Sequence, residues 1–250
     1  MRCAVRKELW ICCAEIAMKA CAAQWIGTRP QQEDSYRVRF FPDGLLVVVC
    51  DGMGGHHHGG RAADKAADAF AEAFGGSSLP VSERMSLALQ SANQAVGKLA
   101  LECAQYGGTT LVAAYIGGGV VRWISVGDSA LFLCRRGCLV RLNADHSMRP
   151  LFNRVELSSP AAANLLRSAL TGESPELVDC SATPVPLLPD DRLILCTDGA
   201  DGVLSPGKLA DEARAVLSSR SGQEASELIS LVCRAASADA DNATILVVDI

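Results

Sequence analysis

Short apolar runs alternate along the chain with longer amphipathic stretches. Runs rich in β-branched and aromatic residues predict strands at 36–41, 45–50, 110–116, 120–126, 131–134, 138–142, 193–196 and 244–250. The turn sequences FPDG (41–44), GGG (117–119) and RRG (135–137) separate neighbouring runs. The strands on either side of these turns are therefore expected to form antiparallel hairpins.

Four segments have the spacing of amphipathic helices, in which apolar residues recur every three or four positions. These segments cover 60–74, 82–103, 206–217 and 223–236. In the third, Ser205 is placed to cap the helix and Pro206 suits its first turn.

The central strands hardly alternate between polar and apolar residues. LLVVVC (45–50), RLILC (192–196) and TILVV (244–248) are almost wholly apolar, which is typical of strands that are covered on both faces. Hairpins make the sheets antiparallel, and the amphipathic helices need sheet surface to cover. We therefore expect an α+β fold, a four-layer α-β-β-α sandwich of two antiparallel sheets flanked by helices. No linker or repeat divides the sequence, so residues 1–250 are expected to form a single domain.

The composition narrows the class of protein. A net charge of −5 argues against a nucleic-acid-binding protein that relies on a basic face, and it suits a site that collects cations. The 11 cysteines are odd in number, lack a CxxC pair and lie among apolar residues, which is typical of reduced thiols in a cytosolic protein. Neither a signal peptide nor a membrane span is evident, so we expect a cytoplasmic protein without a membrane partner.

Acidic residues stand where the predicted strands begin or end. Glu33 and Asp34 precede the strand at 36–41, Asp51 follows 45–50, Asp198 follows 193–196, and Asp241 precedes 244–250. Because one antiparallel strand begins where its neighbour ends, these acids are expected to converge at one sheet edge. Converging carboxylates repel unless cations neutralise them, and Mg²⁺ and Mn²⁺ prefer oxygen ligands. An acid followed by glycine is also a common turn former, but three acids that abut buried strands favour a metal site.

Seven motifs occur together in a recognisable order. They are RPQQED (29–34), DGMGGHHHGGRAA (51–63), GGTT (107–110), VGDSALFL (126–133), ADHS (144–147), CTDGADGVLS (196–205) and DNATILVV (241–248). In order and spacing they resemble the motifs of the metal-dependent PPM or PP2C-like serine/threonine protein phosphatases, from about residue 24 to 250. The form DGMGGH is similar to the bacterial branch.

The resemblance implies a centre that holds two Mn²⁺ or Mg²⁺ ions, with a third as a further option. Asp51 would bridge the two ions, and the Gly52 carbonyl would complete one coordination shell. Asp198 and Asp241 would hold the other ion. Asp128 resembles the acid at the third metal position.

The resemblance also implies the roles of three residues beside the ions. Glu33 and Asp34 would complete the metal site by orienting metal-bound waters. Arg29 would bind the substrate phosphate, where a guanidinium gives two parallel hydrogen bonds. A hydroxide that bridges the metals would then attack the phosphorus of phosphoserine or phosphothreonine directly, without a phosphoenzyme. The implied partners are a phosphorylated protein and a cognate Ser/Thr kinase, and we expect a monomer.

Several positions depart from the family pattern. Gln32 replaces the more usual Asn, and Met53 replaces the His proposed as general acid in eukaryotic members. Ala130 stands where GDSR would place an arginine, which would remove a cation close to Asp128. The segment SPAAANLLRSALTG (159–172) is similar to the helix and following loop of the family's variable flap.

The remaining motif residues have plainer interpretations. His56 matches the family motif, whereas His57 and His58 are expected to face solvent near the start of the following helix. Thr109 and Thr110 are expected to pack under the metal edge. The pair Asp145-His146 (ADHS) is expected to form either a turn with a core histidine or part of the site.

Three alternatives remain open on the sequence. The chain could be a non-catalytic member of the fold, although it retains the main acids. It could be a regulator phosphatase that acts on an anti-sigma-antagonist type of protein. It could also be a zinc hydrolase built on the histidines, although three consecutive side chains point in different directions on a helix.

Overall fold

The computed structural model describes residues 5–11, 18–54, 58–103, 107–151, 165–200, 203–204 and 211–250. Its strands are β1 (Val5–Ile11), β2 (Lys19–Trp25), β3 (Asp34–Phe41), β4 (Gly44–Met53), β5 (Gly108–Thr109), β6 (Leu111–Gly117), β7 (Val120–Val126), β8 (Ala130–Arg135), β9 (Cys138–Arg141), β10 (Asp179–Cys180), β11 (Val185–Pro186), β12 (Arg192–Cys196) and β13 (Ala243–Asp249). Its helices are α1 (His58–Gly75), α2 (Val81–Cys103), the 3₁₀ helix η1 (Asp198–Ala200), α5 (Asp211–Ser218) and α6 (Glu224–Ala235).

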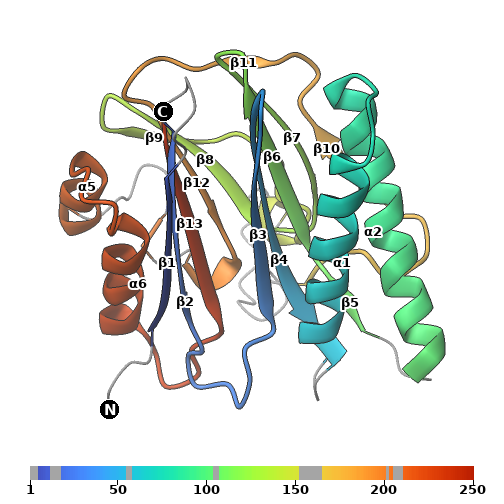
Figure 1. Cartoon of the computed structure of the whole chain (residues 1–250). Helices are drawn as coiled ribbons and strands as arrows, with labels where there is room; N and C mark the ends of the chain where they lie inside the picture. Colours follow the sequence, from blue (N-terminus) through green and yellow to red (C-terminus); the bar gives the residue numbers. More distant parts are fainter. Residues whose placement is uncertain are drawn as a thin grey trace.

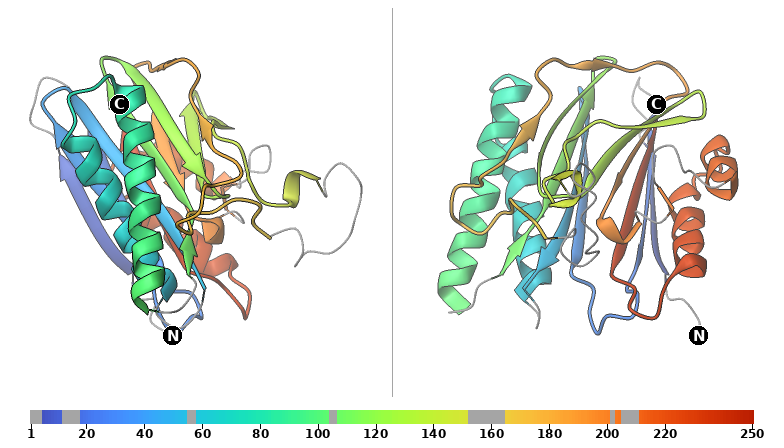
Figure 2. Two further views of the ribbon diagram at one scale, coloured as in Figure 1. Left: turned by 90° about the vertical axis from the view of Figure 1, so that its right-hand side faces the viewer. Right: turned by 180° about the vertical axis from the view of Figure 1, so that it is seen from behind.

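The strands form two antiparallel sheets that face each other. The first sheet has the order β1-β2-β13-β12-β8-β9. The second has the order β10-β7-β6-β4-β3, with β5 added to β4 and β11 to β7. Helices α5 and α6 cover the outer face of the first sheet, and α1 and α2 cover the outer face of the second (Figures 1 and 2). The predicted four-layer α-β-β-α sandwich is confirmed.

Strand β4 shows why its sequence does not alternate. Leu45, Val47 and Val49 belong to the apolar cluster between the two sheets. Leu46, Val48 and Cys50 belong to the cluster between the second sheet and its helices. All six side chains are 0% exposed, because the strand is covered on both faces. A third apolar cluster fills the space between the first sheet, α5 and α6.

Most of the predicted elements are found where the sequence pattern places them, but two N-terminal strands are not predicted. The sequence of β2, KACAAQW, is rich in alanine and has no β-branched residue. It nevertheless pairs with β13 along its whole length and with β1 on its other side. Burial between two partners therefore overrides its weak strand propensity.

Two predictions fall partly outside the described residues. The cap at Ser205 and Pro206 lies outside them, and the structure describes α5 from Asp211. Of the segment predicted to resemble a flap, only 165–172 is described, and this part is not helical. Instead Leu166 and Leu170 form isolated β-bridges, to Ser147 and Thr109. None of the helices in the described ranges is long and apolar enough to cross a membrane.

Candidate active site

The two sheets bring the predicted acids to a common edge. In the second sheet, the register of β3 and β4 places Asp34 directly opposite Asp51. In the first sheet, β12 and β13 run antiparallel, so Asp198 just after β12 lies near Asp241 just before β13. Each sheet therefore contributes one half of the acidic site.

Asp34 is the most enclosed of these carboxylates, with 7% of the residue exposed. Its Oδ2 accepts hydrogen bonds from the hydroxyls of Thr197 at 3.0 Å and Thr244 at 2.7 Å. Its Oδ1 is buried and accepts no hydrogen bond from the described residues. Burial raises the pKa of Asp34 to about 7; the two hydroxyls oppose this rise, and the neighbouring Asp198 and Asp241 add to it.

Asp51 is surrounded by the other acids. Burial raises its pKa well above the ordinary value, and the charges of Asp34, Asp198, Asp128 and Asp241 raise it further. Five carboxylates thus act on one another electrostatically at this edge. A cation that bound here would relieve their repulsion.

The threonines of the GGTT motif fix the backbone of Asp51. The Asp51 amide donates to Thr110 Oγ1 at 2.9 Å, and the Asp51 carbonyl accepts from Thr109 Oγ1 at 2.9 Å. The Thr110 amide also donates to the Asp51 carbonyl, again at 2.9 Å. The expected structural role of these threonines, under the acid edge, agrees with these contacts.

The glycines that follow two of the acids are required by close backbone packing. A Cβ at Gly52 would lie 2.2 Å from the Gly59 carbonyl oxygen, where the start of α1 approaches the end of β4. A Cβ at Gly199 would lie 2.0 Å from the Asn242 carbonyl oxygen. Both glycines therefore let the acid-bearing turns pack against a second piece of backbone.

Arg29 and Asp241 form an ion pair of 2.6 Å at the rim of the site. Both side chains are about half exposed, at 51% and 44%. The structure thus brings the predicted phosphate-binding residue directly beside a predicted metal ligand. As the side chains stand, Asp241 is held by an arginine.

Asn242 has a role that the sequence does not reveal. Its Nδ2 donates to the carbonyls of Ile26 at 2.7 Å and Gln31 at 3.0 Å, and its Oδ1 accepts from the Glu33 amide at 2.7 Å. One amide side chain therefore fixes the loop that carries Arg29 and Glu33. The motif DNATILVV contains this residue, but nothing in the motif indicates that its partners are backbone groups more than 200 positions away.

Arg141 places a cation beside the loop that carries Asp128, in which Ala130 replaces the arginine of the family pattern. Asp128 is buried, and its carbonyl accepts a hydrogen bond of 2.6 Å from the Arg141 guanidinium. The same guanidinium lies 3.5 Å from the Asp145 carboxylate. Ala130 does remove the arginine of the family pattern, and Arg141 places a different guanidinium beside this loop from β9.

The described histidines do not gather into a site. His58 is the first residue of α1, and His56 and His57 lie outside the described residues. His146 is buried, and its Nδ1 accepts a hydrogen bond of 3.2 Å from the Gly127 amide. Burial lowers the pKa of His146. Of the two interpretations of Asp145-His146, the contacts favour a turn with a core histidine.

The donor set at the acid edge fits a hard divalent cation. Within the described ranges, no three acidic, histidine or cysteine side chains converge closely enough to hold one ion as they stand. However, the acids carry oxygen donors only, burial and then their mutual repulsion raise the pKa of Asp34 and Asp51, and Asp34 Oδ1 is a buried acceptor without a donor among the described residues. These are the properties that Mg²⁺ and Mn²⁺ match best.

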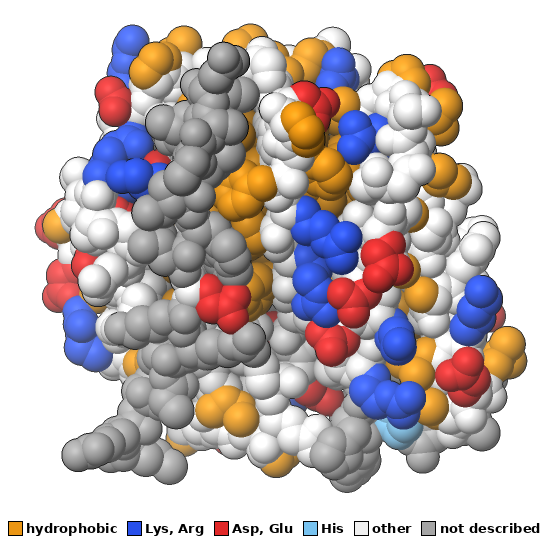
Figure 3. Space-filling model, in the orientation of Figure 1, with side chains coloured by type: hydrophobic (Ala, Val, Ile, Leu, Met, Phe, Trp, Pro, Cys, Tyr) orange, Lys and Arg blue, Asp and Glu red, His pale blue; other side chains and the backbone are white. Residues whose placement is uncertain are grey.

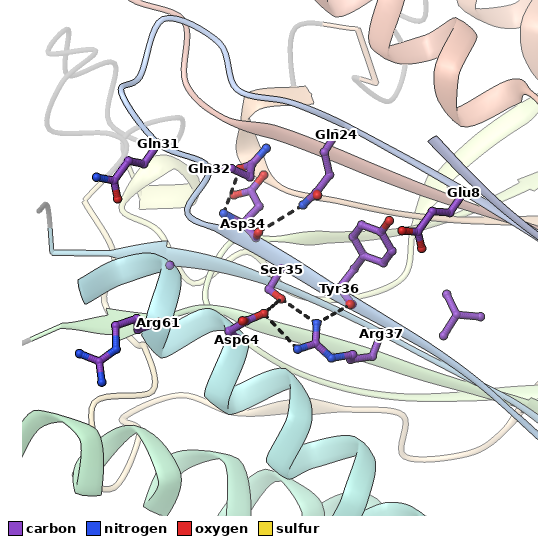
Figure 4. Close-up of a pocket in the computed structure, with 12 residues that line it drawn as sticks. Glu8, Gln24, Gln31, Gln32, Asp34, Ser35, Tyr36, Arg37, Arg61 and Asp64 are labelled. Atoms are coloured by element: carbon purple, nitrogen blue, oxygen red, sulfur yellow. Dashed lines mark hydrogen bonds and ion pairs between the residues drawn. The ribbon is translucent and has the colours of Figure 1, made fainter. Parts of the chain in front are cut away.

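A cavity of about 640 Å³ opens beside Asp34, along the outer edge of β3. Gln31, Gln32 and Asp34 line it at one end, and Arg61 lines it from α1 (Figure 4). Arg37 also lines it but is already engaged by Asp64 and Asp68 of α1, at 3.0 and 2.6 Å. Figure 3 shows hydrophobic side chains in a furrow on the same side of the molecule as β1 and β3, with acidic and basic side chains intermingled at its rim. The cavity beside Asp34 and the furrow thus both carry polar as well as apolar side chains.

Comparisons with known proteins agree with this architecture. Residues 26–233 match the model of the family described as protein phosphatase 2C. The serine/threonine phosphatase stp of Listeria welshimeri is 30% identical over 217 residues, which cover 82% of this chain and 84% of that protein.

Solved structures show the same fold. The serine/threonine phosphatase PstP of Mycobacterium tuberculosis superposes with a TM-score of 0.75 at 25% identity, covering 93% of this chain and 98% of that one. A catalytic domain of PstP, solved in complex with two manganese ions, superposes with a TM-score of 0.72 at 24% identity and covers 98% of this chain and 97% of that one. The chain therefore belongs to the protein phosphatase 2C family and is a serine/threonine protein phosphatase of the bacterial PPM type.

Proposed function

We propose that the acid edge is the catalytic centre, and that it hydrolyses phosphoserine and phosphothreonine in a protein substrate by direct attack of a metal-bridging hydroxide. The observation that carries the proposal is the placement of Asp34, Asp51, Asp198 and Asp241, from two sheets, at one edge where their charges act on one another. Bound divalent cations would supply Lewis acidity, which makes water nucleophilic near neutral pH and stabilises charge on the phosphoryl oxygens. The solved relative with two manganese ions supports this choice of cation.

Different residues of the chain have different proposed roles at this centre. Asp51, Asp198 and Asp241, with the Gly52 carbonyl, would hold two ions, and Asp128 is the candidate ligand for a third. Asp34 is oriented by Thr197 and Thr244, which leaves Oδ1 to accept a hydrogen bond from a water molecule.

Glu33 and Arg29 complete the proposed centre from the loop that Asn242 fixes. Glu33 would orient water beside Asp34. Arg29 would exchange its ion pair with Asp241 for the substrate phosphate once cations occupy the acids. Breaking this ion pair costs little free energy, because both side chains are about half exposed and exposed pairs contribute about 1 kcal/mol or less to stability.

The direct test is hydrolysis of p-nitrophenyl phosphate and of a phosphothreonine peptide with Mn²⁺, Mg²⁺ or Zn²⁺ after treatment with EDTA. We expect turnover with Mn²⁺, and a loss of at least about a hundredfold in Asp198→Asn, because loss of a key electrostatic group costs about 10²–10³ in rate. Glu173→Gln is the matched control: it removes an exposed acid that is not among the proposed site residues, and it should retain full activity. Activity restored by Zn²⁺ but not by Mn²⁺ would instead favour the zinc hydrolase.

The same assay separates the enzyme from a non-catalytic member of the fold. Absence of Mn²⁺-dependent turnover on every phosphorylated substrate, with Mn²⁺ binding intact, would identify a pseudophosphatase. The proposal would then be wrong, even though family membership would stand.

The cellular setting is also part of the proposal. The eight cysteines that the structure describes carry free thiols, which suits a cytoplasmic protein. We expect a monomer that reverses the action of a bacterial Ser/Thr kinase. A deletion strain should therefore accumulate phosphoserine or phosphothreonine sites that are lost again when the wild-type chain, but not Asp198→Asn, is restored.

A further inference from the structure

A second cavity, of about 620 Å³, lies at the other end of the first sheet from the acids. It is formed by the turn between β8 and β9, the residues before β12, and the end of α5 (Figure 1). Strand β12 begins at this cavity with Arg192 and ends at Cys196, two residues before Asp198. At about 3.3 Å per residue the cavity lies roughly 20 Å from the acid edge. It is therefore separate from the proposed catalytic centre.

Arginines dominate the lining of this cavity in a chain whose net charge is −5. Four line it, Arg135, Arg136, Arg192 and Arg220, against two acids, Asp190 and Asp191. The lining residues thus carry two more positive than negative charges, which are offset by Asp249 and Glu224, two acids that pair with Arg192 without lining the cavity.

Two of the four arginines are already committed to the fold. Arg192 is buried and binds the Asp249 carboxylate at 2.6 Å and the Leu217 carbonyl at 2.9 Å. Its position also neutralises the negative end of α5, which would otherwise repel an anion. Arg135 holds the Asp191 carboxylate with two hydrogen bonds, of 2.8 and 2.5 Å.

The other two arginines keep donors for a ligand. Within the described part of the chain, Arg136 makes no hydrogen bond or ion pair. Among the described residues, Arg220 forms two ion pairs at long distances, 3.4 Å to Asp190 and 3.5 Å to Asp249. The Asp190 side chain is 90% exposed, so solvent screens its charge.

The backbone gives a second, independent indication. Arg136 and Asp190 have positive φ angles, 52° and 73°, and they are the two non-glycine residues with this conformation in the described ranges. Both line this cavity. Arg136 and Gly137 form the two-residue loop of a hairpin, where Asn-Gly is the preferred sequence because both positions need positive φ. An arginine in this position is strained, and such strain tends to persist where the side chain has a role.

We propose that this cavity is a second anion-binding site, in which Arg136 and Arg220 bind a phosphate dianion. A guanidinium matches phosphate oxygens with two parallel hydrogen bonds. The two guanidinium groups attract a dianion more strongly than a singly charged ion, and this attraction has to exceed the repulsion from Asp190 and Asp191, which also border the cavity. The phosphate can be free orthophosphate, or a monoester on a protein side chain, since both present the same oxygens.

The test uses the isotope-labelled full chain loaded with diamagnetic Mg²⁺ and titrated with orthophosphate, with a peptide that carries a non-hydrolysable phosphonate analogue of phosphoserine, and with the same peptide carrying serine. We expect amide shifts at 134–138, 188, 190–192 and 220 with orthophosphate and the phosphonate peptide only. Arg136→Gln should weaken these shifts about tenfold or more, as expected for the loss of hydrogen bonds to a charged group. Arg39→Gln, which removes another exposed arginine, should leave them unchanged.

Two further variants keep the test independent of folding and of the catalytic centre. Arg136→Asn should lose the binding while its Tm stays at or above that of the wild type, because asparagine suits the positive φ. Arg29→Ala should abolish phosphate shifts at the acid edge and retain those at the cavity. If the phosphonate peptide binds the cavity much more tightly than orthophosphate does, the natural ligand is a phosphoprotein. If the two affinities are equal, the natural ligand is free phosphate. Shifts confined to the acid edge, or cavity shifts that survive in Arg136→Asn, would overturn the proposal.

Discussion

Asp34 shows how one side chain links burial, pH and metal binding. Its ordinary pKa is about 4, and burial beside other acids raises it to about 7. Between these values the folded chain retains a proton that the unfolded chain has lost. The stability that protonated Asp34 contributes to the metal-free protein is therefore fully present below about pH 4. This contribution is lost as the pH rises through about 7.

We expect the Tm of the EDTA-treated protein to be lower at pH 8 than at pH 5, with part of the decline removed by Asp34→Asn, because the pKa of Asp51 is raised as well. Added Mn²⁺ should also remove it, because a cation offsets the repulsion that ionised Asp34 meets. Glu173→Gln serves as the control. An unchanged pH profile in Asp34→Asn would show that Asp34 does not carry the effect.

The candidate site could be predicted from the sequence only in part, for reasons visible in single residues. Asp51 and Asp198 stand out because each comes within two residues of the end of an apolar run. Asn242 and Arg141 do not stand out, because their partners are backbone carbonyls of segments distant in sequence. The pairing of Arg29 with Asp241 is likewise a product of the tertiary structure.

At the scale of elements, the contact between α2 and the loop after Leu170 is unusually close. Gly97 lies within α2, and a Cβ there would lie 2.8 Å from the Cα of Gly172, whose φ is +95°. In an exposed helix, replacing glycine by alanine stabilises by about 1 kcal/mol. Here the added methyl must displace backbone, so the sign should reverse.

We expect Gly97→Ala to lower the free energy of unfolding by about 1–3 kcal/mol, the usual cost of overpacking. Urea denaturation measures this change. Ser86→Ala, on the exposed face of the same helix, is the matched control and should be neutral or slightly stabilising. A Gly97→Ala protein as stable as the wild type would contradict the close contact.

The predicted strands differ from the missed ones in how strongly their own sequence indicates a strand. Strand β4 carries its own signal, because every residue from 45 to 50 is apolar. Strand β2 carries little, and strands β10 and β11 have two residues each, too few for any pattern. These three depend on their partners in the sheets, which a local pattern does not show.

At the scale of the whole molecule, the two halves of the acid site belong to different sheets. Asp34 and Asp51 are carried by the second sheet, and Asp198 and Asp241 flank strands of the first. The apolar cluster between the sheets therefore sets the distance between the two halves. Leu195 is a fully buried member of this cluster, three residues before Asp198.

We expect Leu195→Ala to lower the free energy of unfolding by about 2–5 kcal/mol, because a cavity remains where the side chain packed between the sheets. Since both sheets depend on this core, far-ultraviolet circular dichroism and tryptophan fluorescence should report one shared transition in urea. The half-saturating Mn²⁺ concentration should also rise, because a loosened core lets the two halves of the acid site move apart. Leu101→Ala, at a position 84% exposed on α2, should change both quantities little. Equal Mn²⁺ dependence in the two variants, at a temperature where both are folded, would show that the inter-sheet core stabilises the fold without setting the geometry of the site.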